Sequence, residues 1–199
     1  MTYHGEAIAL YHRLLESESF RDLAWAEELN SKMEEQGLTA GGRPICPFLR
    51  PHFISSRQYK SLTKATNSLL SAIRRMQNLA VENPQLMARM EMLPAEKMLA
   101  SLDPGYSVQA FTSQLDSHIE NGHLAFVEHN TDTPAGVAFS EGLAELFYET
   151  PILAEFRKRF PLAPVGGKKQ LLNALLEAYK QYGGLKKPQI CILEFQQPF

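Results

Sequence analysis

The sequence predicts a helix-rich α+β protein: a helical N-terminal half, a β-hairpin with flanking helices, and a final strand that begins a parallel sheet. Three observations predict this class. Apolar residues recur at helical spacing through most of residues 1–105. Asn121-Gly122, a strong hairpin signal, stands between two candidate strands. The run 189–195 is almost continuously apolar, as is typical of a strand buried in a parallel sheet.

The helical half begins with two amphipathic segments. We expect a helix over 6–16, because apolar residues recur there every three or four positions. A second helix is expected over 22–36, and Gly37 ends it. Residues 39–51 are rich in glycine and proline, so we expect an extended connector that holds no regular element.

A long helix is expected next. Ser55-Ser56-Arg57-Gln58 has the form of a capping box, which predicts that a helix begins there and runs to about Glu82. Asn83-Pro84 ends or kinks this helix, because the residue before a proline avoids the helical region of backbone angles. Two short helices are then expected, over 84–91 and 95–101.

The second half of the chain begins after the turn Asp103-Pro104-Gly105-Tyr106. The predicted elements are two strands, over 108–119 and 123–130, and then three helices, over 138–148, 151–159 and 168–182. The final strand needs neighbours in a sheet, so we expect the natural chain to continue past Phe199. We therefore divide the sequence into a helical region (1–105), a hairpin and helices (106–187), and the first strand of a truncated α/β sheet (188–199).

Composition narrows the classes of partner. The formal net charge is −2, so no chain-wide basic field favours nucleic acid as a partner. The two cysteines, Cys46 and Cys191, lie far apart and outside any zinc-binding spacing. The N-terminal residues do not resemble a signal peptide, and no stretch is apolar enough to span a membrane. We therefore expect a cytoplasmic protein with neither a nucleic-acid nor a membrane partner.

A carboxylate-rich group of residues near the middle of the chain points most directly to chemistry. Asp116 is followed twelve residues later by Glu128-His129-Asn130, which leads into Asp132-Thr133-Pro134. Hard cations such as Mg²⁺ prefer carboxylate and amide oxygens, and waters and substrate phosphates usually complete the shell. The group is therefore a candidate cation site.

Two hairpin registers are possible, and they place the carboxylates differently. With a two-residue loop, Glu120 opposes His123, and Asp116 and Glu128 fall on opposite faces. With a three-residue loop, Ile119 opposes His123, and the two carboxylates become diagonal neighbours on adjacent strands, with about 7–8 Å between their backbones. The second register puts Gln114, Asp116, Glu128 and Asn130 on one face and Leu115, Ile119, Ala125 and Val127 on the other. We favour it because it separates polar from apolar residues.

Plainer interpretations stay open at these positions. Carboxylates on a half-exposed hairpin are common, and they need no ligand. Asp132-Thr133-Pro134 also has a local explanation, because a polar residue before a proline often caps the start of a helix. Three histidines also lie on the hairpin, but they do not form a zinc-binding pattern.

The pattern Asp116, then Glu128-x-Asn130-x-Asp132-Thr133-Pro134, resembles the N-terminal part of the circularly permuted ATP-grasp family. That family includes glutathionylspermidine synthase and related uncharacterised ligases. Further segments fall in the order expected of the family, and the resemblance covers most of the chain: Arg43-Pro44, Leu102 to Tyr106, Phe126-Val127-Glu128, Pro134-Ala135-Gly136 and the closing strand from Pro188 to Glu194.

The resemblance implies an ATP-dependent ligase that joins a small-molecule carboxylate to an amine through an acyl phosphate. It implies that Asp116, Glu128 and Asn130 bind the Mg²⁺ ions of Mg²⁺–ATP, and that Asp132 and Thr133 contribute to cofactor binding. The family usually has arginine where this chain has Gln114, which supplies no positive charge. The family's nucleotide-contacting lysines and glycine-rich loop would follow the end of this chain, which alone is not a complete enzyme.

Two other interpretations remain. Gly166-Gly167-Lys168-Lys169 opens a helix and therefore has anion-binding character, although it lacks the P-loop pattern. A helix start with exposed lysines is the more ordinary interpretation of this segment. Because Gln114 replaces the usual arginine, the alternative function is a non-catalytic binding or scaffold domain derived from the ligase fold.

Overall fold

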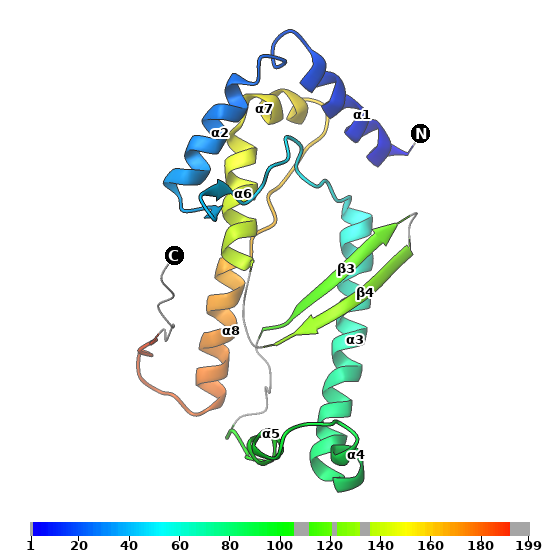
Figure 1. The fold of residues 1–199 in the computed structure, drawn as a ribbon, viewed down its shortest axis with the longest axis vertical. Helices are drawn as coiled ribbons and strands as arrows, with labels where there is room; N and C mark the ends of the chain where they lie inside the picture. The colour runs from blue at the N-terminus through cyan, green and yellow to red at the C-terminus, as the bar shows by residue number, and fades with distance from the viewer. Residues whose placement is uncertain (1, 106–111, 121–122, 132–135, 192–199) are drawn as a thin grey trace. The chain divides into compact units, whose positions relative to one another are not determined.

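The computed structural model describes residues 2–105, 112–120, 123–131 and 136–191. Within these ranges the chain forms eight helices and two small antiparallel hairpins, so the predicted helix-rich α+β class is confirmed (Figure 1). The predicted parallel sheet is not among the described strands. Residues 189–191 have no regular structure, and the rest of the predicted final strand lies outside the described residues.

The chain forms two compact units. The first comprises residues 1–54, 134–174 and 189–199, and the second comprises residues 55–133 and 175–188. Helix α8 (Lys168–Gln181) begins in the first unit and ends in the second. The division into three consecutive regions stays a prediction from sequence.

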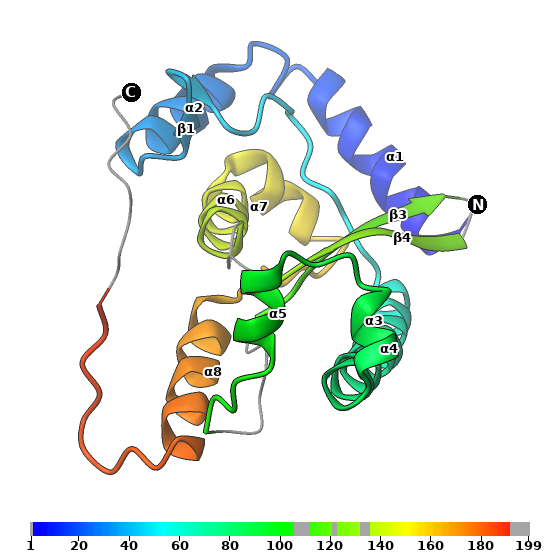
Figure 2. The same cartoon turned by 60° about the horizontal axis from the view of Figure 1, so that its bottom comes forward.

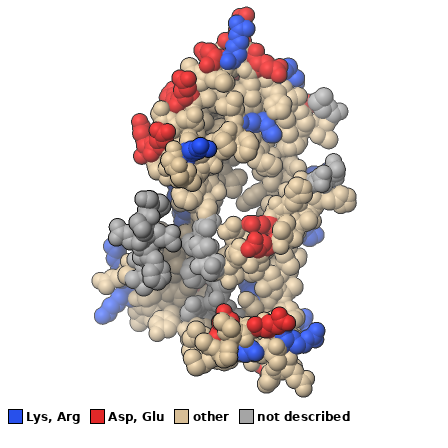
Figure 3. All heavy atoms as spheres, viewed as in Figure 1, with Lys and Arg blue, Asp and Glu red and all other residues tan. Residues whose placement is uncertain are grey.

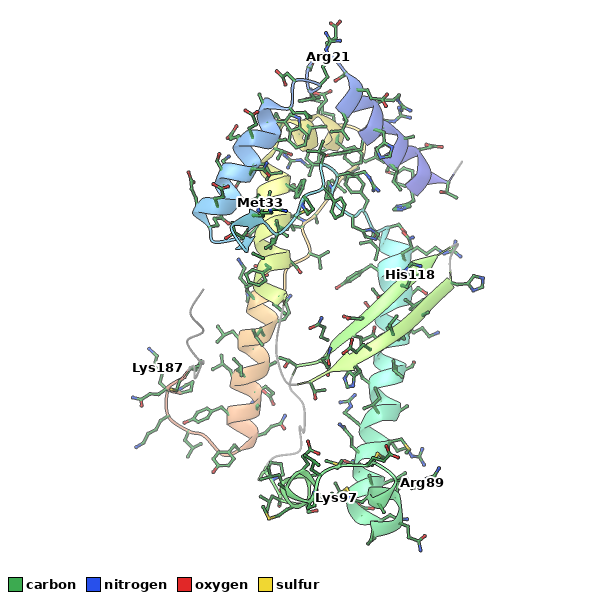
Figure 4. All side chains as sticks on the ribbon, viewed as in Figure 1. Arg21, Met33, Arg89, Lys97, His118 and Lys187 are labelled. Carbon is green, nitrogen blue, oxygen red and sulfur yellow. The ribbon has the colours of Figure 1, made fainter. Side chains whose placement is uncertain are left out.

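Four helices build the first unit: α1 (Tyr3–Glu16), α2 (Ala24–Glu35), α6 (Val137–Glu149) and α7 (Pro151–Arg157). Helix α7 contacts α1, and α6 contacts α2. Both views show α6 and α7 inside the angle that α1 and α2 make (Figures 1 and 2). Met33 lies on the side of α2 that faces α6 (Figure 4). Two sequence-distant helix pairs therefore close over one core.

Aromatic side chains dominate this core. Phe156 of α7 is fully buried, and its ring stacks on that of Phe53 with 4.8 Å between centroids. Tyr11 of α1 packs edge-on against both rings, and its hydroxyl donates to the carbonyl oxygen of Leu49 at 2.8 Å. That hydrogen bond satisfies the polar end of a buried ring. Burial also raises the pKa of Tyr11 far above its ordinary value.

The glycine- and proline-rich connector is more ordered than the sequence predicts. Strands β1 (Thr39–Ala40) and β2 (Arg43–Pro44) pair as a minimal antiparallel hairpin. Gly41 and Gly42 both have positive φ, +58° and +73°, as a two-residue hairpin turn requires. The expectation of no regular element here was wrong, because glycine pairs can also close a tight hairpin.

The second unit is built on α3 (Ser56–Glu82), followed by α4 (Pro84–Ala88) and α5 (Pro94–Ala100). The predicted capping box is confirmed. The backbone N–H of Gln58 donates to the Ser55 hydroxyl at 3.2 Å, and the backbone N–H of Ser55 donates to the side-chain oxygen of Gln58 at 2.9 Å. Most side chains of α3 are exposed or half-buried, and Ala80 is its one buried residue. None of the described helices is long and apolar enough to cross a membrane.

The larger hairpin completes the second unit. It consists of β3 (Gln114–Glu120) and β4 (His123–Asn130), and both views show it beside α3 (Figures 1 and 2). Its two faces differ in polarity, and the polar face carries the candidate site.

Candidate cation site on the hairpin

The register of the hairpin differs from the favoured prediction. Glu120 pairs with His123, and Ser117 pairs with Phe126, which is the register of a two-residue loop. The predicted register of a three-residue loop, with Asp116 opposite Phe126, was therefore wrong. Asn121 and Gly122 lie outside the described residues.

A bulge in β4 then changes the register. Ser117 opposes Phe126, but the next residue of β3, Asp116, opposes Glu128. Val127 is thus the extra residue of the bulge, and 75% of it is exposed. Without the bulge, a two-residue loop would place the two carboxylates on opposite faces. With it, Asp116 faces Glu128 directly across the strands, and Gln114 faces Asn130.

The other face of the hairpin is apolar. Paired positions share a face, so Leu115, Ile119, Leu124 and Phe126 lie together, and all four are half-buried. The predicted apolar face had Ala125 and Val127 from β4, and both are instead exposed. The loop length accounts for this error, because a one-residue slip moves every side chain of a strand to the opposite face.

The polar face holds four side chains that hydrogen-bond in pairs along each strand. On β3, the Gln114 side-chain amide donates to Oδ1 of Asp116 at 3.1 Å. On β4, the Asn130 side-chain amide donates to Oε1 of Glu128 at 3.2 Å. Each bond joins residues two apart, which share a face of a strand. Each amide thereby holds one oxygen of a carboxylate and leaves the second oxygen without a described hydrogen-bond partner.

Electrostatics favour a cation at this position. Side chains that are directly opposed on paired strands have Cβ atoms about 4.5–5.5 Å apart, and like charges there destabilise the sheet. No described lysine or arginine forms an ion pair with Asp116 or Glu128. Figure 3 shows acidic side chains gathered on the hairpin, on the face turned toward the viewer. A cation between the two carboxylates would remove the repulsion.

The protein alone supplies an incomplete coordination shell here. Among the described residues, no group of three or more histidine, cysteine, aspartate or glutamate side chains can hold a metal. The hairpin offers two carboxylates and the carbonyl oxygens of two side-chain amides. That set fits Mg²⁺, which usually takes one or two carboxylates and completes its shell with water and phosphate oxygens. The predicted cofactor-binding residues Asp132 and Thr133 lie outside the described residues.

The three histidines of the hairpin are divided between its two faces. His118, which lies on β3 (Figure 4), and His123, which pairs with Glu120, are on the same face as Asp116. His129 opposes Leu115 on the apolar face, where its Nε2 atom is buried and makes no hydrogen bond. His129 therefore cannot join the other two histidines at one metal ion, and the expectation of no zinc site stays a prediction from sequence.

The other candidate, the start of α8, is already occupied by a side chain of the first unit. The Glu141 carboxylate accepts hydrogen bonds from the backbone amides of Gly167 and Lys168, the latter at 2.8 Å. These bonds lower the pKa of Glu141, and the Lys168 ammonium lies 3.7 Å away. The glycines allow the approach, because a Cβ on Gly166 would lie 2.8 Å from the Glu141 carboxylate. This anion-binding helix start is satisfied internally.

Two features of the site were missed at the level of sequence. Gln114 was placed on the polar face and noted as the replacement of an arginine, but its hydrogen bond to Asp116 was not expected. Its spacing of two residues from Asp116 on a predicted strand was the available signal. The Val127 bulge has no local signal, because Phe126-Val127-Glu128 alternates like an ordinary strand.

No family model, no curated protein and no solved structure matches this chain. The resemblance to the permuted ATP-grasp family therefore stays a prediction that rests on the sequence motif.

Proposed function

We propose that the hairpin contributes Mg²⁺ ligands to an ATP-dependent carboxylate–amine ligase. The observation that carries the proposal is the direct opposition of Asp116 and Glu128, with no described lysine or arginine to neutralise them. The motif resemblance supplies the reaction class. The substrates would be a small-molecule carboxylate and an amine. The reaction would take place in the cytoplasm, where ATP is available.

The residues divide into two roles in this proposal. Asp116 and Glu128 would bind the cation, and the Asn130 carbonyl oxygen would be a third ligand. Gln114 and Asn130 hold the carboxylates through their amide groups, which restricts the carboxylate rotamers before any ligand binds. When bound, Mg²⁺ would neutralise negative charge on the ATP phosphates. Asp132 and Thr133 would contribute to the cofactor site.

A direct test uses Mn²⁺ as a paramagnetic substitute for Mg²⁺. In NMR spectra of the whole chain, Mn²⁺ is expected to broaden the amide signals of residues 114–116 and 128–130 first, and excess Mg²⁺ should reverse the broadening. Glu128→Ala and Asn130→Ala should each weaken Mn²⁺ binding, Glu128→Ala by about tenfold or more, because a charge-assisted ligand is lost. Glu34→Ala, on the exposed face of α2, is the matched control. Broadening centred elsewhere, or unchanged in Glu128→Ala, would refute the metal-ligand assignment.

One observation favours the alternative, a non-catalytic binding or scaffold domain. The Gln114 amide is bound to Asp116 and supplies no positive charge at the position where the related ligases usually have arginine. The two functions can be separated with Gln114→Arg in the longest natural chain. If that substitution raises ATP hydrolysis in the presence of candidate acids and amines, the result favours the ligase function. A site that binds Mg²⁺ but gains no activity favours the scaffold.

A further inference from the structure

We propose that the exposed face of α3 binds the phosphate backbone of a nucleic acid strand, independently of the cation site. Between its ends, α3 carries five cationic residues and one acid, Glu82 at its last position. Its net charge is therefore +4, although the chain as a whole is at −2. The expectation of no nucleic-acid partner rested on the chain-wide sum, which hides this segregation.

The five cations share one side of the helix. Projected at about 100° per residue, they fall within an arc of about 100° and extend along about 27 Å of the axis. All are exposed, and none forms an ion pair with a described carboxylate: Arg57, Lys60, Lys64, Arg74 and Arg75. The half-buried apolar stripe, which includes Leu62, Leu69 and Ile73, lies on the opposite side. The cationic face is therefore not the face that packs.

Uncharged hydrogen-bonding groups continue the cationic face. Asn67, Ser71 and Asn78 are exposed on the same side, so a polar group recurs about once per helical turn from Arg57 onward. A shallow open hollow on α3 combines two of the lysines with hydroxyl and amide groups and one aromatic ring: Tyr59, Lys60, Thr63, Lys64, Asn67, Ser68 and Ser71. Lysine, arginine, serine, threonine and asparagine are the side chains that contact nucleic-acid phosphates.

The chemistry of this face selects among anionic partners. Exposed ion pairs to an acidic protein contribute little, whereas a polyphosphate strand releases condensed counterions for each phosphate that is neutralised. A helix that binds a lipid surface inserts its apolar stripe into the lipid, and the apolar stripe of α3 is already half-buried in the folded chain at Leu62, Leu69 and Ile73. Tyr59, which is 47% exposed beside Lys60, offers a ring on which a base can stack. These features favour a nucleic acid strand.

The test measures binding of a labelled single-stranded oligonucleotide, as DNA and as RNA, to the whole chain by fluorescence anisotropy. If five contacts form, log K should fall with log salt with a slope of about −3.5. Lys60→Gln/Lys64→Gln should weaken binding on the order of tenfold and reduce the slope by about 1.4. Lys186→Gln/Lys187→Gln makes the same charge change outside α3 and should alter affinity by less than about twofold.

Two further arms decide the class of partner. Tyr59→Leu should weaken oligonucleotide binding by about fivefold or more and leave heparin binding unchanged, because heparin has no bases to stack. Equal losses in the two lysine double variants would overturn the assignment to α3. Tighter binding to polyglutamate or to anionic lipid vesicles than to the oligonucleotide would overturn the assignment to nucleic acid.

Discussion

The two compact units differ in where their apolar side chains lie. The first unit holds the whole buried cluster, which includes Tyr11, Phe53 and Phe156. In the second unit, Ala80 is the one hydrophobic residue described as buried, while large apolar side chains of α5 such as Met98 and Leu99 are more than 60% exposed. Yet the candidate cation site and the cationic face both belong to the second unit. Packing and candidate chemistry are thus concentrated in different parts of the chain.

The largest expected effect is on the core of the first unit. Phe156→Ala removes a fully buried ring that contacts three other aromatic rings, so it should lower the free energy of unfolding by about 3–5 kcal/mol. Leu99→Ala in α5 is the matched control, because Leu99 is 61% exposed and should change this free energy by about 0.5 kcal/mol or less. Urea unfolding measures both. Similar losses in the two variants would contradict the contrast between the units.

A smaller effect is expected where α6 holds the start of α8. A Cβ on Gly166 would lie 2.8 Å from the Glu141 carboxylate, so Gly166→Ala should destabilise the protein by about 1–3 kcal/mol through overpacking. In a Glu141→Ala background the crowding atoms are gone, and the same substitution should be almost neutral. A double-mutant cycle by urea unfolding measures the coupling. If the two substitutions have additive effects on the free energy of unfolding, crowding by Glu141 does not explain the need for glycine at position 166.

The same contact predicts a pH dependence. The backbone amides of Lys168 and Gly167 lower the pKa of Glu141 in the folded protein below its ordinary value of 4.5. The stability that this carboxylate contributes is therefore fully present above about pH 4.5 and is lost as the pH falls through the folded pKa. Urea unfolding of Glu141→Gln and the parent protein should show a constant difference from pH 5 to 7 that shrinks in more acidic buffer. A difference that grew on acidification would contradict the assignment.

Local signals in the sequence predicted most of the fold. Ser55 and Gln58 gave the start of α3, because a capping box depends on neighbouring residues alone. The helix expected over 168–182 and the strand expected over 123–130 match α8 and β4 closely. The Gly41-Gly42 hairpin was missed because glycine pairs are equally common in loops without pairing.

The site was harder to predict, because it depends on register. Asp116 and Glu128 were placed on one face by the wrong loop, and the structure brings them together by a two-residue loop and a bulge. Pairing is a competition between whole strands, so no single residue reports it. The contact of Glu141 with Gly167 joins positions 26 apart in sequence, and nothing in the local pattern marks it.

In the second unit, the candidate site is expected to reduce stability slightly. Asp116→Asn removes a like-charge pair across the strands, so it should stabilise the hairpin by about 0.2–1 kcal/mol while weakening Mn²⁺ binding. Hydrogen exchange of the β3 and β4 amides measures local stability, with Glu34→Gln on α2 as the charge-matched control. Added Mg²⁺ should protect these amides in the parent protein and not in the variant. Faster exchange in Asp116→Asn would argue against repulsion at this site.

The smallest effect is expected from deletion of Val127, and it separates the bulge from the pairing. Removal of the extra residue leaves Phe126 opposite Ser117 and Glu128 opposite Asp116, so Mn²⁺ affinity should change by less than about threefold. Deletion of Ala125 is the matched control. It also leaves the carboxylates opposed, but it moves Phe126 to the exposed face, which should cost about 1 kcal/mol or more of hairpin stability. If deletion of Val127 abolishes Mn²⁺ binding, the bulge itself aims Glu128, and pairing alone does not make the site.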